Sequence, residues 1–327
     1  MRAWVVDGAG DPGDVLSLIE VDDPDPRPGE VMLRVEAAGV GLPDALMCRS
    51  TYAFSPALPF TPGQEVCGRV VAVGEGVAIA PGERLMGVTS FYDGRGGLAE
   101  YTVAPASTLF RVPPSMPSSV AATFRIGYST ALIGLRRRGA LSAGERVLVL
   151  GAAGGSGITA IHVAKALGAQ VIAVVSSEDK ARVCERSGAD VIIDRSASEV
   201  VDSVLEVTAG KGVDLVYDPV GGDLADRSVA CLAPSGRLLL VGFASGRWAN
   251  PPIDVVVRRN ISLVGVYAGG ISRTENEQDH EFLLSLFETG LLGSFVREVP
   301  FERAVEAVIS VDRGLTAGKS AVVMEGA

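Results

Sequence analysis

The feature that most constrains the fold is the segment at residues 147–169, VLVLGAAGGSGITAIHVAKALGA. Its first residues form an apolar run typical of a buried strand, and the part from Gly157 onward has the apolar spacing of a helix. Between the two lie glycines at positions 151, 154, 155 and 157. Such glycines allow a tight turn and a close approach of backbone to a pyrophosphate, while the helix N-terminus offers N–H donors. The segment therefore predicts a dinucleotide-binding turn.

The chain around this turn alternates between apolar strands and amphipathic helices. The strand-like runs are 146–150, 171–175, 191–193, 215–217, 237–241 and 261–266, and the helix-like runs are 157–167, 179–187, 198–208 and 223–232. Alternation of this kind is typical of βαβ units around a parallel sheet. We therefore predict an α/β fold with a Rossmann-type, doubly wound parallel sheet.

The first third of the chain has a different pattern. Short apolar runs at 31–35, 66–73, 84–88 and 99–103 are separated by glycines and prolines, which favours a β-rich, barrel-like domain. After Pro117 the pattern becomes helical. We predict a β-rich domain at 1–120, the dinucleotide-binding domain at 121–268, and a C-terminal segment at 269–327 that folds back onto the first domain, with helices near 278–289 and 301–312.

Charge and composition exclude several functions. The net charge of −10 has the wrong sign for binding a nucleic acid or an anionic membrane surface. The longest run without Asp, Glu, Lys or Arg, at 147–164, contains the glycine turn and is no membrane span. The N-terminus lacks the apolar stretch of a signal peptide, so we expect a cytoplasmic protein. Four scattered cysteines and two histidines give no support to a metal site or a hydrolase triad.

The end of the second strand of the α/β domain indicates which dinucleotide binds. NAD sites usually carry an acid about 20 residues beyond the glycines, where it holds the ribose 2′-hydroxyl. This chain has Ser176 there, followed by Ser177 and Lys180, with Arg195 one strand later. Hydroxyls and cations suit a 2′-phosphate, so we predict NADPH. The alternative is that Lys180 is simply a solvated residue in the first turn of a helix.

Several motifs together resemble the medium-chain dehydrogenase/reductase superfamily and, within it, the zinc-free quinone oxidoreductase branch that includes zeta-crystallin. The resemblance covers the whole chain. The motifs are VEAAGVG at 35–41 with Asp44, LPFTPGQEVCGRVVAVGEGV at 58–77, GGLAEYTVAP at 96–105, GYSTA at 127–131, the glycine turn, GVDLVYDPVGG at 212–222, SGRLLLVGFASG at 235–246, NISLVGVY at 260–267 and AGKSAVVM at 317–324. The resemblance implies a GroES-like substrate domain, built from both ends of the chain, and a central Rossmann domain.

The same resemblance implies catalysis without a metal. Zinc-dependent relatives use a Cys after the early Gly-Val and a His in the Gly-His-Glu position, and here those positions read Gly41-Leu42 and Gln64-Glu65. A catalytic zinc needs about three protein ligands, and these are missing here, so we expect no metal. Without a metal, the cofactor should carry the chemistry while the protein orients the reactants. Hydride transfer to a quinone, or to the β-carbon of an α,β-unsaturated carbonyl, fits this description.

The resemblance also suggests individual site residues. Tyr52 matches an active-site tyrosine and Gln64 could donate its amide hydrogen to a substrate carbonyl, although each has an ordinary packing role as its alternative. The cofactor-binding candidates are Thr130, Ala152, Ala153, Gly154, Gly155, Ser156, Gly157, Ser176, Ser177, Lys180, Arg195, Val220, Gly242, Phe243, Val266 and Tyr267. Relatives usually carry Asn at Gly41 and Tyr at Leu132, and these departures make the pocket more apolar.

Three functional hypotheses follow. The favoured one is an NADPH-dependent quinone reductase. An enoyl or 2-alkenal reductase is the alternative within the same fold and cofactor class, and nothing in the sequence separates the two. The third is a protein that binds NADPH without catalysis. We also expect a homodimer formed through the strand at 261–266, because an exposed apolar edge strand favours association.

Overall fold

The computed structural model describes residues 1–293 and 295–325 of the chain. It divides into two compact units, one comprising Met1–Ile126 and Val296–Ala327, the other Gly127–Phe295.

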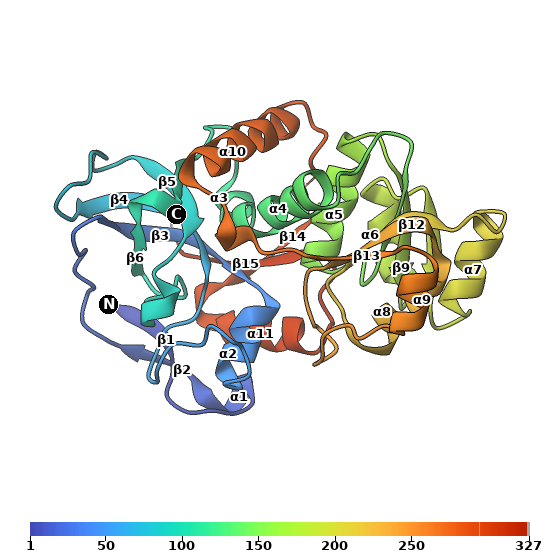
Figure 1. Cartoon of the computed structure of the whole chain (residues 1–327). Helices are drawn as coiled ribbons and strands as arrows, with labels where there is room; N and C mark the ends of the chain where they lie inside the picture. Colours follow the sequence, from blue (N-terminus) through green and yellow to red (C-terminus); the bar gives the residue numbers. More distant parts are fainter. Residues whose placement is uncertain (294, 326–327) are drawn as a thin grey trace. The chain divides into compact units, whose positions relative to one another are not determined.

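The second unit is built on a six-stranded parallel sheet with the strand order β10-β9-β8-β11-β12-β13. Strands β9, β12 and β13 and the helices α5 to α9 of this unit are labelled in Figure 1. The strand order and the parallel registers confirm the predicted Rossmann fold. Its strands are β8 (Arg146–Val149), β9 (Gln170–Val175), β10 (Val191–Asp194), β11 (Val213–Asp218), β12 (Leu232–Leu240) and β13 (Ser262–Gly265). The middle strands β8 and β11 carry a fully buried apolar core, as a sheet covered on both faces requires, made of Val147, Leu148, Val149, Leu215, Val216 and Tyr217.

Three of the predicted helices, at 157–167, 179–187 and 198–208, are present with ends that differ by one or two residues. The helix predicted at 223–232 ends at Ser228, because a 3-10 turn at Val229–Cys231 leads into a strand that starts at Leu232, and the helix expected near 278 already starts at Arg273. The helix Ile253–Arg258 was not predicted. The helices of this unit are α4 (Arg125–Leu132), which starts at the unit boundary and continues in a wider π-type turn to Arg138, α5 (Gly155–Ala166), α6 (Glu178–Arg186), α7 (Val200–Val207), α8 (Gly222–Ser228), α9 (Ile253–Arg258) and α10 (Arg273–Glu288). No helix in the described part of the chain is both long enough and apolar enough to cross a bilayer.

The first unit contains a seven-stranded, mainly antiparallel sheet with the order β14-β15-β3-β4-β5-β7, and β6 pairs with β3. Its strands are β3 (Glu30–Val40), β4 (Glu65–Val73), β5 (Arg84–Val88), β6 (Tyr101–Pro105), β7 (Leu109–Arg111), β14 (Val296–Pro300) and β15 (Lys319–Val323), and a separate pair is formed by β1 (Arg2–Val6) and β2 (Leu16–Glu20). Helices α1 (Pro12–Val15), α2 (Leu42–Cys48), α3 (Ser118–Ala121) and α11 (Ala304–Asp312) accompany the sheet.

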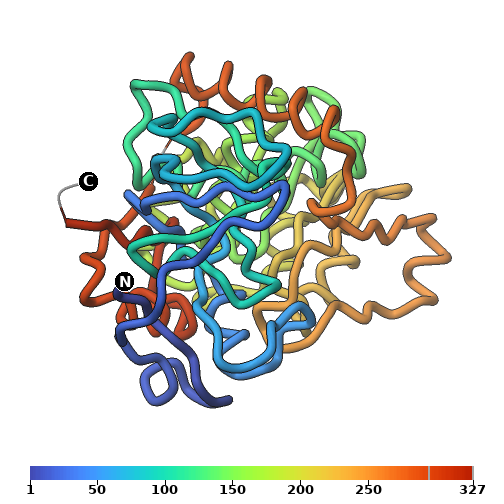
Figure 2. Tube along the Cα trace, turned by 90° about the vertical axis from the view of Figure 1, so that its left-hand side faces the viewer, coloured from blue at the N-terminus to red at the C-terminus, as the bar shows by residue number. Residues whose placement is uncertain are grey.

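Both ends of the chain contribute to this first unit. Strand β15 pairs antiparallel with β3, and Figure 2 shows the red C-terminal part beside the blue N-terminal part. The indole nitrogen of Trp4 donates a hydrogen bond to the carbonyl of Phe301 at 2.8 Å, which adds a buried tie between the two segments. The β-rich unit is thus assembled from both ends, as the resemblance implied.

The second boundary between the units differs from the one expected at residue 268. Helix α10 belongs to the second unit, because Arg137 pairs with Glu275 at 3.0 Å and with the buried Asp279 at 2.9 Å. The chain therefore returns to the first unit at Val296, and Ser294, Gly326 and Ala327 of the predicted C-terminal segment lie outside the described residues.

Candidate functional site

The glycine turn joins β8 to α5 at the carboxyl edge of the parallel sheet. Gly154 is the N-cap of α5 and has no side chain to cap the first helical amides, so these N–H groups can donate to an anion. The amide of Ala152 donates to the carbonyl of Val174 at 3.0 Å, which fixes the turn against β9. A Cβ on Gly157 would lie 2.5 Å from the Ala152 carbonyl oxygen, so the turn fits closely against the helix only because this residue is glycine.

The loop after β9 brings the predicted 2′-phosphate residues together. Ser177 is the N-cap of α6 and accepts a hydrogen bond from the amide of Lys180, whose ammonium group donates to Ser176 Oγ at 3.2 Å. The amide of Arg195 donates to the carbonyl of Val175 at 3.0 Å, so this exposed arginine starts its loop beside the end of β9. Four candidates from two loops therefore meet at one strand end.

The ends of β12 and β13 hold the candidates for the nicotinamide side. The amide of Gly242 donates to the Asp218 carbonyl at 3.1 Å, and the amide of Val266 donates to the Leu240 carbonyl at 3.1 Å. A carboxamide would therefore meet the carbonyl groups of these residues rather than their amides. Phe243 packs against Trp248 with ring centroids 4.9 Å apart, and Tyr267 is exposed. Thr130 is half-buried on α4, where Leu132 is completely buried.

An aspartate that the sequence analysis did not select organises the loop after β11. Asp218 is completely buried, and its Oδ1 accepts hydrogen bonds at 2.8 Å from the amides of Val220 and Gly221. Its Oδ2 has no hydrogen-bond partner among the described residues. Burial raises the pKa of Asp218 to about 6, although the hydrogen bonds from Gly221 and Val220 act in the opposite direction. The hydroxyl of Tyr217, the preceding residue, lies 3.1 Å from Ser156 Oγ, and this contact links β11 to the first turn of α5.

In the first unit, a buried carboxylate positions the segment that contains Gln64. The two oxygens of Asp44 accept hydrogen bonds at 2.8 Å from the amides of Gly41 and Gly63. Burial raises the pKa of this carboxyl to about 6. The next residue, Glu65, accepts hydrogen bonds from Lys319 at 2.8 Å and from the amide of Ile126 at 2.7 Å. Gln64 is therefore held from both sides along the backbone.

The side chain of Gln64 is only 7% exposed, and its Nε2 has no hydrogen-bond partner in the part of the chain that the structure describes. A buried amide without a partner costs roughly 1–3 kcal/mol in free energy of folding, so such groups point to a ligand or a water.

Tyr52 belongs to a row of aromatic rings. Its centroid lies 5.6 Å from Phe54, which lies 5.8 Å from Tyr92, and both of these neighbours are exposed.

Among residues 1–293 and 295–325, no three His, Cys, Asp or Glu side chains are grouped as metal ligands. All four cysteines are buried and unpaired. His162 is buried as well, which lowers its pKa to about 4, and its Nδ1 lies 2.8 Å from the hydroxyl of Tyr128.

Comparison with known proteins identifies the family. Residues 27–114 match the alcohol dehydrogenase GroES-like domain, and residues 155–285 match the zinc-binding dehydrogenase model. The mouse quinone oxidoreductase-like protein 2 is 36% identical over 256 residues, which cover 78% of this chain and 72% of the relative. The chain belongs to the quinone oxidoreductase branch of the medium-chain dehydrogenase/reductase superfamily. The predicted family and the GroES-like domain are therefore confirmed, and the protein is an oxidoreductase.

Two solved structures of this oxidoreductase family resemble the whole chain. A mycobacterial protein complexed with NADPH is 32% identical to this chain and has a TM-score of 0.91. The match covers 99% of this chain and 100% of the mycobacterial one. The quinone oxidoreductase of Escherichia coli, also complexed with NADPH, has 27% identity and a TM-score of 0.91 over 99% of this chain and 100% of that one.

Two polar residues of this quinone oxidoreductase homologue were not predicted as site residues. Asp218 lies within the motif GVDLVYDPVGG, and Ser129 precedes Thr130. Ser129 Oγ is buried without a partner among the described residues. In the sequence, Asp218 stands out only as a polar residue at the end of an apolar strand, and Ser129 only as a polar residue within an apolar helix. That Asp218 Oδ2 and Ser129 Oγ lack partners in the described part of the chain follows only from the folded structure.

Proposed function

We propose that the protein is an NADPH-dependent reductase that transfers hydride to a quinone. The observation that carries the cofactor choice is the hydrogen bond from Lys180 to Ser176 at the end of β9, where an acid would hold the ribose of NAD. A cation and hydroxyls at this position suit a 2′-phosphate. The two NADPH complexes among the similar structures support the same choice.

When bound, NADPH supplies a hydride from C4 of its nicotinamide. The residues of this chain would hold the pyrophosphate at the amides of Gly155 and Ser156 and the 2′-phosphate at Lys180. The reduction of a quinone to the hydroquinone would then need one hydride, for which a C–H bond of the cofactor breaks, and one proton from water. Gln64 would donate its unpartnered amide hydrogen to the substrate carbonyl, where negative charge develops. Tyr52 would hydrogen-bond the substrate oxygen through its hydroxyl.

The names of similar proteins support a quinone as the acceptor. The mouse relative is named a quinone oxidoreductase-like protein, and the Escherichia coli structure is a quinone oxidoreductase. The cytoplasm is the proposed location. An enone would use the same cofactor and the same oxygen contact, so the two acceptor classes have to be compared directly.

The test is a titration of the purified protein with NADPH and with NADH, followed by addition of 1,4-benzoquinone or a simple enone. We expect tight NADPH binding and quinone-dependent oxidation of the cofactor, which is measured as the loss of nicotinamide absorbance. If NADPH is oxidised faster with the enone than with the quinone, the enone becomes the proposed acceptor class. Binding without oxidation by any acceptor would contradict the reductase proposal, and the absence of binding would contradict the cofactor site itself.

A further inference from the structure

Three arginines lie in one row across the sheet of the first unit. Arg34 on β3 is directly opposite Arg69 on β4, and Arg69 is directly opposite Arg84 on β5. Residues directly opposite in antiparallel strands project from the same face with Cβ atoms about 4.5–5.5 Å apart, where like charges repel. The protein as a whole has ten more acidic than basic residues, so a row of three cations requires an explanation.

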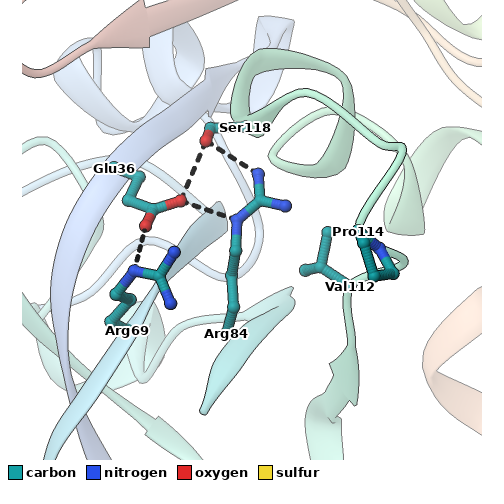
Figure 3. Close-up of a pocket in the computed structure, with 6 residues that line it drawn as sticks. All are labelled: Glu36, Arg69, Arg84, Val112, Pro114 and Ser118. Carbon is teal, nitrogen blue, oxygen red and sulfur yellow. Dashed lines mark hydrogen bonds and ion pairs between the residues drawn. The ribbon is translucent and has the colours of Figure 1, made fainter. Parts of the chain in front are cut away.

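Only one carboxylate is recorded as an ion-pair partner of this row in the described residues. Glu36 Oε1 lies 2.9 Å from Arg69 Nε, and Glu36 Oε2 accepts a hydrogen bond from Arg84 Nε at 2.8 Å (Figure 3). Burial alone would raise the pKa of Glu36, but hydrogen bonds from Arg84 and Ser118 outweigh it and hold this pKa below its ordinary value. Glu36 therefore stays ionised and offsets one of the three positive charges.

Arg84 has a structural role. It donates to the carbonyl of Met116 at 3.0 Å and to Ser118 Oγ at 2.8 Å, and its side chain is 17% exposed. These contacts attach the start of α3 to the sheet. Because its three nitrogens all have protein partners, Arg84 does not by itself indicate a ligand.

Arg69 and Arg34 are different. Arg69 is 47% exposed, and apart from Glu36 its one recorded contact is a long hydrogen bond of 3.4 Å to the carbonyl of Gly82. Within the described residues, Arg69 Nη2 and the whole guanidinium group of Arg34 have no hydrogen-bond partner. Both groups therefore keep donors that can bind an anion, and arginine is suited to carboxylate or phosphate because its donors form a planar fork.

A pocket of about 480 Å³ lies at this row, lined by Glu36, Arg69, Arg84, Val112, Pro114 and Ser118. This volume is in the range of small-molecule sites. In Figure 3 the two arginines stand next to each other below Glu36, and Val112 and Pro114 form an apolar wall. The pocket thus combines an unsatisfied cationic fork with an apolar surface.

We propose that this pocket binds a small organic anion. Its carboxylate or phosphate group is held by Arg69, with Arg34 adding positive charge at the edge of the row, and its apolar part packs against Val112 and Pro114. Ligand binding offsets the repulsion that the row would otherwise retain. The proposal is independent of the hydride-transfer reaction, because every residue in it belongs to the first unit and none is among the candidates for cofactor or acceptor binding.

The test compares the full chain with the variants Arg69→Gln and Arg34→Gln. Arg111→Gln is the matched control, because Arg111 lies on the neighbouring strand β7, is 83% exposed and pairs with Glu83 outside the row. Arg84 is left intact, since its substitution would free the start of α3. The probes are benzoate, phenyl phosphate and inorganic phosphate, titrated calorimetrically at low salt with and without NADPH.

We expect benzoate or phenyl phosphate to bind the unmodified chain and the Arg111→Gln variant equally. Loss of a charge-assisted contact should weaken binding to Arg69→Gln about tenfold or more. Preference between the two organic probes identifies the anionic group, and weaker binding of inorganic phosphate supports the apolar wall. Equal binding to Arg69→Gln, equal weakening in Arg111→Gln, or no binding of either organic anion would overturn the proposal. Binding abolished by NADPH would also overturn it, since that binding would lie at the glycine turn.

Discussion

The ammonium group of Lys180 donates a hydrogen bond to Ser176 Oγ at 3.2 Å. This contact places a positive charge at the carboxyl end of β9. Arg182 pairs with Glu178 at 2.6 Å and lies 3.8 Å from Asp179, so it offsets one of the two nearby acids. The ammonium group of Lys180 is held at the strand end by Ser176, while the two acids are directed to Arg182.

The first prediction concerns the cofactor preference. Lys180→Ala should raise the Michaelis constant for NADPH about ten- to a hundredfold, because one charge-assisted contact to the 2′-phosphate is lost. The constant for NADH should change little. Steady-state kinetics with both cofactors measure this, and Lys211→Ala, at an exposed lysine after α7, is the control. An equal effect on NADPH and NADH would contradict the 2′-phosphate assignment.

The second prediction concerns the glycine turn. Gly157→Ala would place a Cβ 2.5 Å from the carbonyl oxygen and 2.6 Å from two further backbone atoms of Ala152, and backbone cannot yield cheaply. We expect a loss of roughly 1–3 kcal/mol in unfolding free energy, together with weaker cofactor binding. Gly154→Ala is the matched control, because its nearest contact would be 3.4 Å. Thermal unfolding of the two variants measures this difference. Equal stability of Gly157→Ala and Gly154→Ala would contradict the close fit of the turn against α5.

The Rossmann unit was predictable because its signals are local. Apolar strand runs, the glycines before α5 and the serines after β9 lie close together in the sequence, and each determines its own turn or cap. Helix α10 could not be assigned in this way. Its place in the second unit depends on the ion pairs of Arg137 with Glu275 and Asp279, which join residues more than a hundred positions apart.

The arginine row shows the same limit for a site. Its alignment depends on the register of β3 against β4, and that register shifts on either side of Arg34 and Val35. An irregularity of this kind cannot be read from alternation of apolar and polar residues. Likewise, Gln64 could be proposed from a family motif, but the missing partner of its amide follows only from the packed structure.

The third prediction separates a substrate contact at Gln64 from a packing role. Gln64→Leu removes a buried amide without a partner, so the unfolding free energy should stay the same or rise. The value of kcat/KM for the quinone should fall about two- to tenfold, while the Michaelis constant for NADPH is unchanged. Gln170→Leu, at the exposed start of β9, serves as control. A destabilised variant with unchanged kinetics would assign Gln64 to packing.

The fourth prediction concerns pH. The pKa of Asp218 is raised from 3.8 to about 6, so between these values the folded protein holds a proton that the unfolded chain has released. Its contribution to stability is therefore greatest at low pH and falls as pH rises through this window, by about 2–3 kcal/mol. Above pH 6 the contribution stays constant.

Urea unfolding of the unmodified chain and of Asp218→Asn, from pH 4 to pH 7, measures this contribution as the difference between the two unfolding free energies. The variant cannot lose a proton at this position, so the difference should shift in its favour as pH rises. Asp254→Asn, at an exposed residue of α9, is the control variant. A difference that does not change with pH would contradict the raised pKa.

The last prediction is a homodimer through β13. This strand is the end strand of the six-stranded sheet, and an exposed edge strand pairs readily with another chain. Apolar residues lie exposed along it and on α9, with Leu263 at 38% and Val257 at 68%. Light scattering at micromolar concentration should give the mass of two chains, and Leu263→Lys combined with Val257→Lys should give one. Leu315→Lys, at a residue 71% exposed in the other unit, should leave the dimer intact. A monomeric unmodified chain would reject the edge-pairing model, because the apolar edge would then be tolerated in water without a partner.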